Sequence, residues 1–210
     1  MSLRSEYSMP MSHYVALEGI DGTGKSSVQR ALGSWLESDG HEVVLVREPG
    51  GGAIGEAIRQ ILLHDDLRLV PWAEALLFAA QRAQLAAETI RPALQRGAWV
   101  LGDRSVYSSL AYQAVGRSLG LDQVKAVNEA GLGGTWPDLV ILLTVSPEIG
   151  LKRQAIADRI GAEGLAFQTA VAAAFDGLAE AEPDRFVRIE TERPLEDVVA
   201  DSCAAVKAHW

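Results

Sequence analysis

The residues best suited to chemistry lie in one short stretch, GIDGTGKSS, which spans residues 19–27. Its glycines, lysine and first serine satisfy the spacing G-x-x-x-x-G-K-S. Glycines let the backbone curl until several N–H groups face one anion, and the N-terminus of a following helix directs more of them there. The lysine adds positive charge, and the serine hydroxyl can bind Mg²⁺. The stretch therefore predicts a phosphate-binding loop made of Gly19, Ile20, Asp21, Gly22, Thr23, Gly24, Lys25, Ser26 and Ser27.

A carboxylate is expected beside such a loop, because Mg²⁺ prefers oxygen ligands. The apolar run WVLGD ends at Asp103, where a neighbouring strand of the same sheet would end. Ser26 and Asp103 are therefore the predicted ligands of Mg²⁺, with Asp103 acting directly or through water. The alternative is that Asp103 only caps the next helix.

The elements that must position these residues are apolar strands separated by segments of helical periodicity. Strands are predicted at 14–17, 43–46, 98–102, 139–145 and 185–189. Helices are predicted at 28–36, 54–62, 72–96 with a break near Pro92, 105–117, 122–130, 147–157, 165–181 and 194–208. Strands that are apolar on both faces and alternate with helices indicate a parallel sheet covered on both sides. We expect one α/β domain over residues 13–210, preceded by a flexible leader at 1–12.

Composition narrows the class of partner. The 210 residues include 28 Asp and Glu against 19 Lys and Arg, and this balance argues against general binding of nucleic acid. Cys203 is the only cysteine, so an intramolecular disulfide is excluded. No apolar run reaches the roughly 18 residues of a membrane span, and no signal peptide is recognisable. We expect a soluble cytoplasmic protein that binds small anions, with no nucleic-acid or membrane partner.

Phosphate-binding loops occur in switches, motors and kinases, so the rest of the chain must separate these classes. A GTP-binding switch normally has an Asn-Lys-x-Asp guanine reader after a later strand, whereas residues 144–150 read TVSPEIG. Large ATPase motors have longer chains and additional motifs. The short chain and its arginines in several loops favour a small nucleotide or nucleoside kinase. In such an enzyme Arg and Mg²⁺ neutralise the transferred phosphoryl group, and positioning supplies most of the catalysis.

From about residue 13 to 208 the chain resembles the bacterial thymidylate (dTMP) kinases, a family of P-loop nucleoside monophosphate kinases. The resemblance rests on LEGIDGTGKSS (17–27), REPGG (47–51), LFAAQRAQL (77–85), GDRSVYSSLAYQ (102–113) and PDLVILL (137–143). It implies a three-layer P-loop NTPase fold with a five-stranded parallel sheet and a short mobile lid at about 151–164. It also implies a homodimer that transfers the γ-phosphoryl group of Mg·ATP to dTMP, giving dTDP and ADP for dTTP synthesis, with residues 19–27 on the ATP phosphates.

The resemblance further implies which residues bind dTMP. Arg47 would grip the acceptor phosphate, a task that suits a guanidinium better than an ammonium group. Phe78 would stack on the thymine ring, and Arg82 would reach the base edge from the same face of the helix. Without the resemblance, Phe78 and Arg82 would read as a core residue and a surface charge.

The remaining implied acceptor contacts follow strand 98–102 or lie in the loop. Ser108 and Gln113 would hydrogen-bond the pyrimidine edge or order water there, and Tyr112 would crowd the 2′ position of the sugar. Arg104 would contact phosphates beside the strand-end carboxylate. Asp21 would face the sugar hydroxyl and phosphate region of the acceptor.

The catalytic arginine is expected in the lid, because the loop itself contains none. This pattern resembles the subgroup of the family whose lid supplies that residue, so Arg153 and Arg159 are the candidates. Either could instead be a solvated helix charge. With Lys25, Arg104 and Asp21 they complete the predicted catalytic set.

Three features depart from the family pattern and keep alternatives open. Ser105 stands where an aromatic residue or His is common after Asp-Arg, the lid is shortened, and LAFQTAVAAAFDGLAE (165–180) lacks the expected Arg-rich, Tyr-containing pattern. One alternative is a nucleotide-binding regulator with weak or no catalysis. The other is a nucleotide kinase of different base preference.

Overall fold

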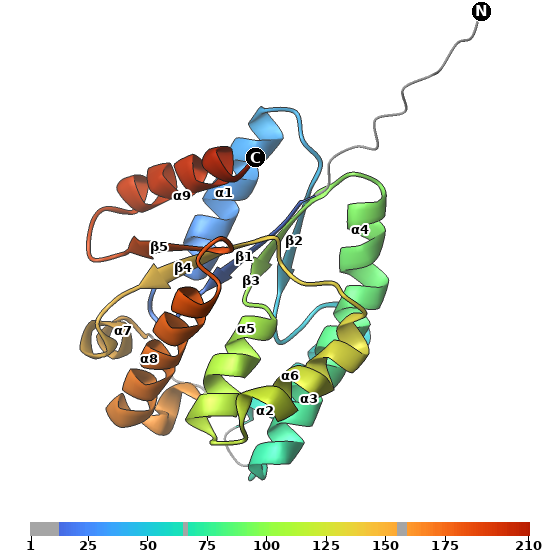
Figure 1. Cartoon of the computed structure of the whole chain (residues 1–210), viewed down its shortest axis with the longest axis vertical. Helices are drawn as coiled ribbons and strands as arrows, with labels where there is room; N and C mark the ends of the chain where they lie inside the picture. Colours follow the sequence, from blue (N-terminus) through green and yellow to red (C-terminus); the bar gives the residue numbers. More distant parts are fainter. Residues whose placement is uncertain (1–12, 65–66, 155–158) are drawn as a thin grey trace, which may run out of the picture.

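A five-stranded parallel sheet forms the centre of the structure (Figure 1). The computed structural model describes residues 13–64, 67–154 and 159–210. The strand order is β2-β3-β1-β4-β5. The strands are β1(His13–Glu18), β2(Val43–Arg47), β3(Trp99–Asp103), β4(Leu139–Thr144) and β5(Phe186–Glu190). All five predicted strands are confirmed.

Helices cover both faces of this sheet, which confirms the predicted three-layer α/β fold (Figure 1). On one face, Val15 and Leu17 of β1 pack with apolar residues of α1 and α9. On the other face, Ala16 belongs to a core shared with α3, η2, α6 and α8. The helices and helical segments are α1(Lys25–Ser38), α2(Gly52–Leu63), α3(Pro71–Leu85), η1(Ala86–Ile90), α4(Arg91–Gln95), α5(Val106–Ser109), η2(Leu110–Gly116), α6(Leu121–Leu132), α7(Pro147–Arg153), η3(Gly161–Glu163), α8(Leu165–Ala181) and α9(Leu195–His209).

The long helical segment after Pro71 does not break near Pro92, so that part of the prediction was wrong. Instead, α3 continues through the π-helical segment η1 directly into α4, and Pro92 lies in the first turn of α4. A proline inside a regular α-helix would clash with the preceding turn. The wider π-helical turn just before Pro92 lets the helical chain continue through it.

Two predicted features lie wholly or partly outside the described residues. The flexible leader, residues 1–12, is one of them. The predicted lid at 151–164 is described only at its two ends, by the last residues of α7 and by residues from 159 to η3. Within the described residues, no helix is both long and apolar enough to cross a bilayer.

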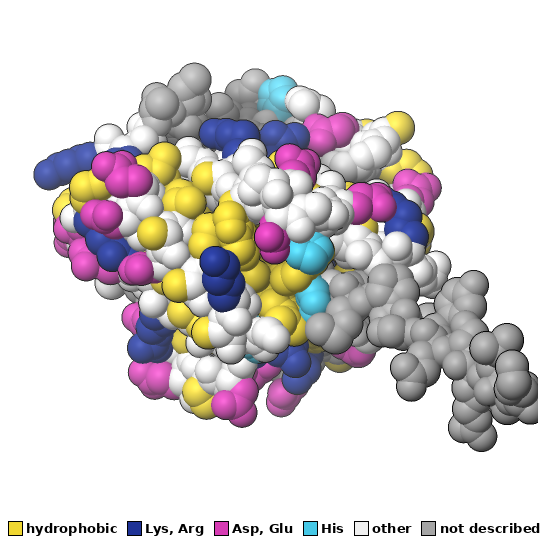
Figure 2. Space-filling view, turned by 90° about the horizontal axis from the view of Figure 1, so that it is seen from above, with side chains coloured by type: hydrophobic (Ala, Val, Ile, Leu, Met, Phe, Trp, Pro, Cys, Tyr) yellow, Lys and Arg dark blue, Asp and Glu magenta, His cyan; other side chains and the backbone are white. Residues whose placement is uncertain are grey.

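The amino end of the sheet is closed by a group of aromatic rings, which we call the aromatic cluster: His13, His41, Trp99 and Trp210. His13 lies 4.3 Å from Trp99 and 4.1 Å from Trp210, measured between ring centroids. His41 lies 5.4 Å from Trp99. Figure 2 looks onto the molecule from the top of Figure 1 and shows histidine side chains beside hydrophobic ones. The carboxyl end of the sheet instead carries the charged residues of the candidate site.

Candidate active site

Strand register places the candidate residues together at the carboxyl end of the sheet. Leu17 of β1 pairs with Asp103 of β3, and Asp103 pairs in turn with Arg47 of β2. Because parallel strands end at the same edge, the loop after β1 lies beside both of these side chains. The sheet therefore brings the predicted phosphate loop, metal ligand and acceptor arginine to one place.

The loop between β1 and α1 has the backbone that a phosphate cradle requires. Gly22 has a φ of 81°, and a Cβ there would lie 2.2 Å from the carbonyl oxygen of Gly150. Gly24, with a φ of 86°, directly precedes α1. The N-terminus of α1 thus opens onto the loop, with its unpaired N–H groups and positive dipole end.

Lys25 lies across the loop and is only 7% exposed. Its Nζ donates hydrogen bonds to the carbonyl oxygens of Gly19, at 3.1 Å, and Ile20, at 2.8 Å. Burial, reinforced by the nearby Arg104, lowers the pKa of Lys25 to about 8, although surrounding carboxylates oppose the shift. A desolvated ammonium group held by carbonyl oxygens is well prepared to meet an anion.

Ser26 and Asp103 meet at the mouth of the loop, because the Ser26 hydroxyl donates a hydrogen bond to Asp103 Oδ2. The two side chains offer a hydroxyl and a carboxylate oxygen, the donor types that Mg²⁺ prefers. Among the described residues, no cluster of three or more His, Cys, Asp or Glu could hold a metal ion. By their donor types, Ser26 and Asp103 fit Mg²⁺ whose other ligands would be phosphate and water oxygens.

A cavity of about 410 Å³ opens beside the loop. Most of the predicted site residues line it: Asp21, Gly22, Gly24, Lys25, Ser26, Ser27, Arg47, Phe78, Asp103, Arg104, Ser108, Tyr112 and Gln113. Five further residues, not singled out from the sequence, complete its wall: Glu48, Pro49, Arg59, Leu63 and Ile160. Phosphate-loop residues thus share one cavity with the residues predicted to hold an acceptor.

Arg104 links the loop to the side of this cavity where an acceptor is predicted to bind. Its φ of 74° is unusual for a residue with a side chain, which marks a backbone held in place by its surroundings. Its guanidinium donates to the carbonyl oxygen of Gly19 at 3.2 Å, to Ser108 Oγ at 3.1 Å and to Asp21. Burial alone would raise the pKa of Asp21, but Arg104 and Lys25 hold it below its usual value.

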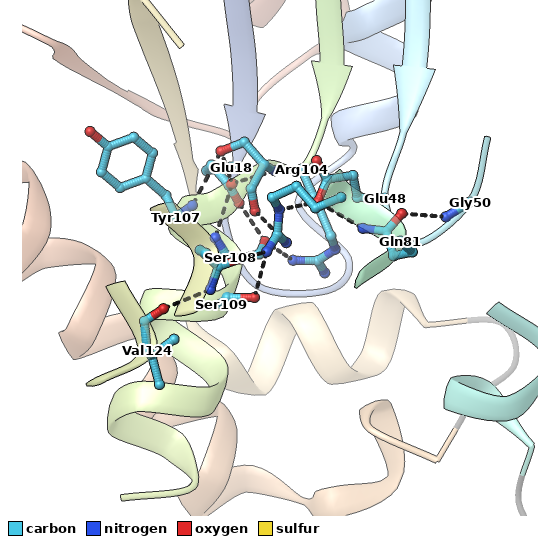
Figure 3. Close-up of polar contacts among 12 residues, drawn as sticks. Glu18, Glu48, Gly50, Gln81, Arg104, Tyr107, Ser108, Ser109 and Val124 are labelled. Carbon is cyan, nitrogen blue, oxygen red and sulfur yellow. Dashed lines mark hydrogen bonds and ion pairs between the residues drawn. The ribbon is translucent and has the colours of Figure 1, made fainter. Parts of the chain in front are cut away.

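A buried carboxylate at the end of β1, Glu18, supports this arrangement (Figure 3). It accepts hydrogen bonds from the backbone N–H and hydroxyl groups of Ser105, both at 2.7 Å, and from the Ser108 hydroxyl at 2.7 Å. Burial raises the pKa of Glu18, while Arg104 and the two serines oppose the rise. Ser105, which departs from the family pattern, thus serves here as the N-cap of α5 and a partner of Glu18.

The side of the cavity predicted to hold an acceptor is built by α2, α3 and η2. Phe78 projects from α3, while Tyr112 and Gln113 come from the π-helical segment η2. Arg47 is about half-exposed and donates to Glu56 Oε1 at 3.1 Å. An aromatic ring and an arginine paired with Glu56 therefore face the same space.

The structure does not bring Arg82 to the cavity. Its side chain is 1% exposed, and its Nε donates to Glu48 Oε2 at 2.6 Å. The two remaining nitrogens donate to Ser109, Asn128 and the carbonyl oxygen of Ser105. Figure 3 shows the surrounding network, in which Gln81 connects Glu48 to Gly50. Here Arg82 holds α3 to its neighbours, and its predicted contact with a base edge stays a prediction.

Neither predicted lid arginine lines the cavity. Arg153 is exposed and donates to the carbonyl oxygen of Thr191 at 3.2 Å. Arg159 donates to the carbonyl oxygen of Leu62 at 2.9 Å and to Glu74 Oε2 at 2.8 Å. Both side chains bind other parts of the protein in this structure, so their catalytic roles stay predictions.

Several residues of the site were missed from the sequence. Glu18 had a recognisable signal, because it ends an apolar strand as Asp103 does. Arg59 lines the cavity and donates to the carbonyl oxygen of Pro49 at 2.7 Å, but a single arginine on an amphipathic helix reads as a solvated charge. Gln154 donates to Asp21 Oδ2 at 3.1 Å, a contact between residues far apart in the chain that no local pattern could indicate.

Together the sheet order, the glycine loop at the start of α1 and the shared cavity define a protein of the P-loop NTPase class with room for a second ligand. Comparisons with known proteins narrow this class. The family model described as thymidylate kinase matches residues 17–202. The chain belongs to the thymidylate kinase family.

Individual relatives agree with this assignment. A thymidylate kinase of Clavibacter michiganensis subsp. michiganensis is 44% identical over 191 residues, covering 89% of this chain and 90% of that protein. A thymidylate kinase of Synechococcus sp. strain JA-3-3Ab is 43% identical over 194 residues, covering 92% of this chain and 95% of that protein. The crystal structure of thymidylate kinase from Ehrlichia chaffeensis superposes with a TM-score of 0.80 at 25% identity, covering 94% of this chain and all of that one.

Proposed function

We propose that this protein transfers the γ-phosphoryl group of ATP to dTMP, giving dTDP and ADP for dTTP synthesis. The observation that carries the proposal is the single cavity in which a phosphate loop, three arginines and the Phe78 ring face one another. Membership of the thymidylate kinase family supports the choice of acceptor.

The donor phosphates would lie on the loop between β1 and α1. Backbone N–H groups of residues 19–27 and the N-terminus of α1 would bind them, and Lys25 would neutralise the transferred group. Ser26 and Asp103 would hold Mg²⁺, which supplies positive charge to the phosphate oxygens when bound. The Lys25 contacts with loop carbonyl oxygens support this arrangement, because they hold the ammonium group at the loop.

The acceptor would occupy the other half of the cavity. Phe78 would stack on the base, Tyr112 would pack against the sugar, and Arg47 and Arg104 would bind the phosphate. Asp21, held by Arg104, would face the sugar and phosphate. An oxygen of the acceptor phosphate then attacks the γ-phosphorus, and the bond to the β–γ bridging oxygen breaks. No covalent intermediate on the protein is required. This mechanism uses neither Arg153 nor Arg159.

The test is ADP release from Mg·ATP with dTMP, dUMP, dCMP, UMP, CMP, AMP or GMP, and with no acceptor as the control. We expect turnover that depends on dTMP, with dUMP a poorer acceptor. Turnover with another acceptor alone would retain a kinase but reject thymidylate as its substrate. Binding of ATP and dTMP without turnover would instead favour the alternative of a nucleotide-binding regulator with weak or no catalysis.

We also propose that the protein acts in the cytoplasm as a homodimer. Exposed apolar side chains on α2 and α3 support an association surface: Ile54, Ile61, Trp72 and Leu76. Light scattering of the purified protein tests the oligomeric state, and a monomer at all accessible concentrations would contradict it.

A further inference from the structure

Glu74, in the first turn of α3, is a buried carboxylate that the proposed mechanism does not use. It is 1% exposed. It accepts hydrogen bonds from Gln113 Nε2 at 3.0 Å, from Arg117 Nε and Nη2, both at 3.2 Å, and from Arg159 Nη2 at 2.8 Å. Burial favours a raised pKa for Glu74, but the bonds from Arg117, Gln113 and Arg159 hold the pKa below its ordinary value. Glu74 is therefore ionised near neutral pH and can only accept hydrogen bonds.

An ionised Glu74 settles which way the Gln113 amide points. A carboxylate cannot accept from an amide oxygen, so the NH₂ group must face Glu74 and Oε1 must point the other way. No described residue donates to Gln113 Oε1, and this oxygen is not among the buried polar atoms that lack a partner. Because Gln113 lines the cavity, Oε1 opens onto it as an unused acceptor.

The other side chains predicted at the base edge are already committed elsewhere. Arg82 is buried and spends all its guanidinium nitrogens on protein partners. The Ser108 hydroxyl donates its one hydrogen to Glu18, and its oxygen accepts from Arg104 Nη1. Gln113 Oε1 is thus the side-chain acceptor that a base stacked on Phe78 would meet. Thymine and uracil carry a hydrogen on N3, whereas N3 of cytosine is itself an acceptor.

We propose that Glu74 is a positioning residue that fixes the orientation of the Gln113 amide and thereby selects thymine and uracil against cytosine. The assignment rests on the proposed function, because it requires a pyrimidine nucleotide in the cavity. Opposed acceptors in a buried site are costly, since each loses its hydrogen bond to water and gains none.

The test is the selectivity of Glu74→Gln, defined as kcat/KM for dTMP divided by kcat/KM for dCMP. An amide at position 74 can donate as well as accept, so the Gln113 amide can turn over and offer NH₂ to cytosine. We expect this selectivity to fall roughly tenfold or more. The ratio of dTMP to dUMP should stay unchanged, because both bases carry the N3 hydrogen.

Arg117→Gln is the matched control. It removes another partner of Glu74 but leaves the bond between Glu74 and Gln113 in place. We expect it to retain the selectivity of the wild type, whatever it does to stability. A fall in selectivity equal to that of Glu74→Gln would show that general loosening, and not amide orientation, is responsible, and would overturn the assignment.

A second pair of variants tests the assignment through Gln113, and its first member alone covers the case in which Glu74→Gln does not fold. Gln113→Leu removes the acceptor oxygen itself and should also lower the selectivity. In a Gln113→Leu background, Glu74→Gln should lower it no further, because Glu74 acts only through Gln113. Full selectivity in Gln113→Leu would overturn the assignment without any measurement on Glu74.

The two proposals can fail separately. A wild-type protein that turns over dTMP, combined with unchanged selectivity in a folded Glu74→Gln variant, would overturn the role of Glu74 alone. A wild-type protein that does not phosphorylate dTMP would overturn the proposed function and this role with it.

Discussion

The two ends of the sheet are built from opposite chemistry. At the carboxyl end, the buried charges of Lys25 and Glu18 lie close to the partly buried Arg104, and each of the three makes several hydrogen bonds. At the amino end, the aromatic cluster packs ring against ring. Placing charges away from water is expensive even when they are paired, whereas burying aromatic rings is favourable.

This difference indicates a division of labour between the two ends. The charged end is arranged for a ligand that brings negative charge, and we expect its own contribution to stability to be small. The aromatic cluster contributes no residue to the cavity, and its buried rings can stabilise the fold. Substitutions at the two ends should therefore affect different measurements, and the predictions below test that separation.

The largest effect is expected for Lys25→Met at the charged end. Removing a positioned positive charge from the transferred phosphoryl group should lower kcat with dTMP on the order of 10²–10³-fold. The free energy of unfolding, measured with denaturant, should change by less than about 1 kcal/mol, because the lost ammonium group is a buried charge with a desolvation cost. A large loss of stability together with the loss of turnover would contradict the division of labour.

Trp99→Ala at the amino end should show the opposite pattern. Trp99 is 6% exposed and contacts both His13 and Trp210. Loss of this ring should lower the free energy of unfolding by about 3 kcal/mol, as for other large-to-small core substitutions. At a temperature where the variant is folded, kcat and KM should match the wild type. Impaired turnover in the folded variant would show that the two ends are coupled.

The smallest effect is expected from the titration of His13. Burial lowers its pKa below 6.5, with help from His41 and His209 and against the attraction of Asp138. The unfolded chain therefore takes up this proton at higher pH than the folded protein, so acidification below about pH 6.5 favours unfolding.

His13→Phe keeps a ring in the cluster but has no titrating group. The free energy of unfolding should fall less between pH 7.5 and pH 5.5 in this variant than in the wild type. Turnover measured at the two pH values should differ no more in the variant than in the wild type. An equal loss of stability in both proteins would remove His13 from the pH dependence.

The fold was predictable because its signals are local. Each strand is a continuous apolar run between turn residues, and alternating strands and helices leave few topologies for a parallel sheet. The long segment after Pro71 shows the limit of such signals. A proline such as Pro92 normally ends a helix. The π-helical segment η1 that precedes it depends on packing against neighbouring elements, and no sequence pattern indicates it.

The site was predictable to different degrees on its two sides. The loop at residues 19–27 and Asp103 follow from spacing and from the position of strand ends. The hydrogen-bond partners of Arg82 and Arg159 could not be predicted from the sequence. Each has a partner far away along the chain, Glu48 and Glu74 respectively, and only the fold shows that these carboxylates claim the guanidinium groups.

The aromatic cluster also determines which processes the intrinsic tryptophan fluorescence of this protein can report. The chain has five tryptophans, and none of them lines the cavity beside the phosphate loop. Trp99 and Trp210 instead share the amino end with His13, whose protonated ring can quench indole emission. Intrinsic fluorescence should therefore follow unfolding and acidification, while nucleotide titrations will need a dye or labelled nucleotide to be seen.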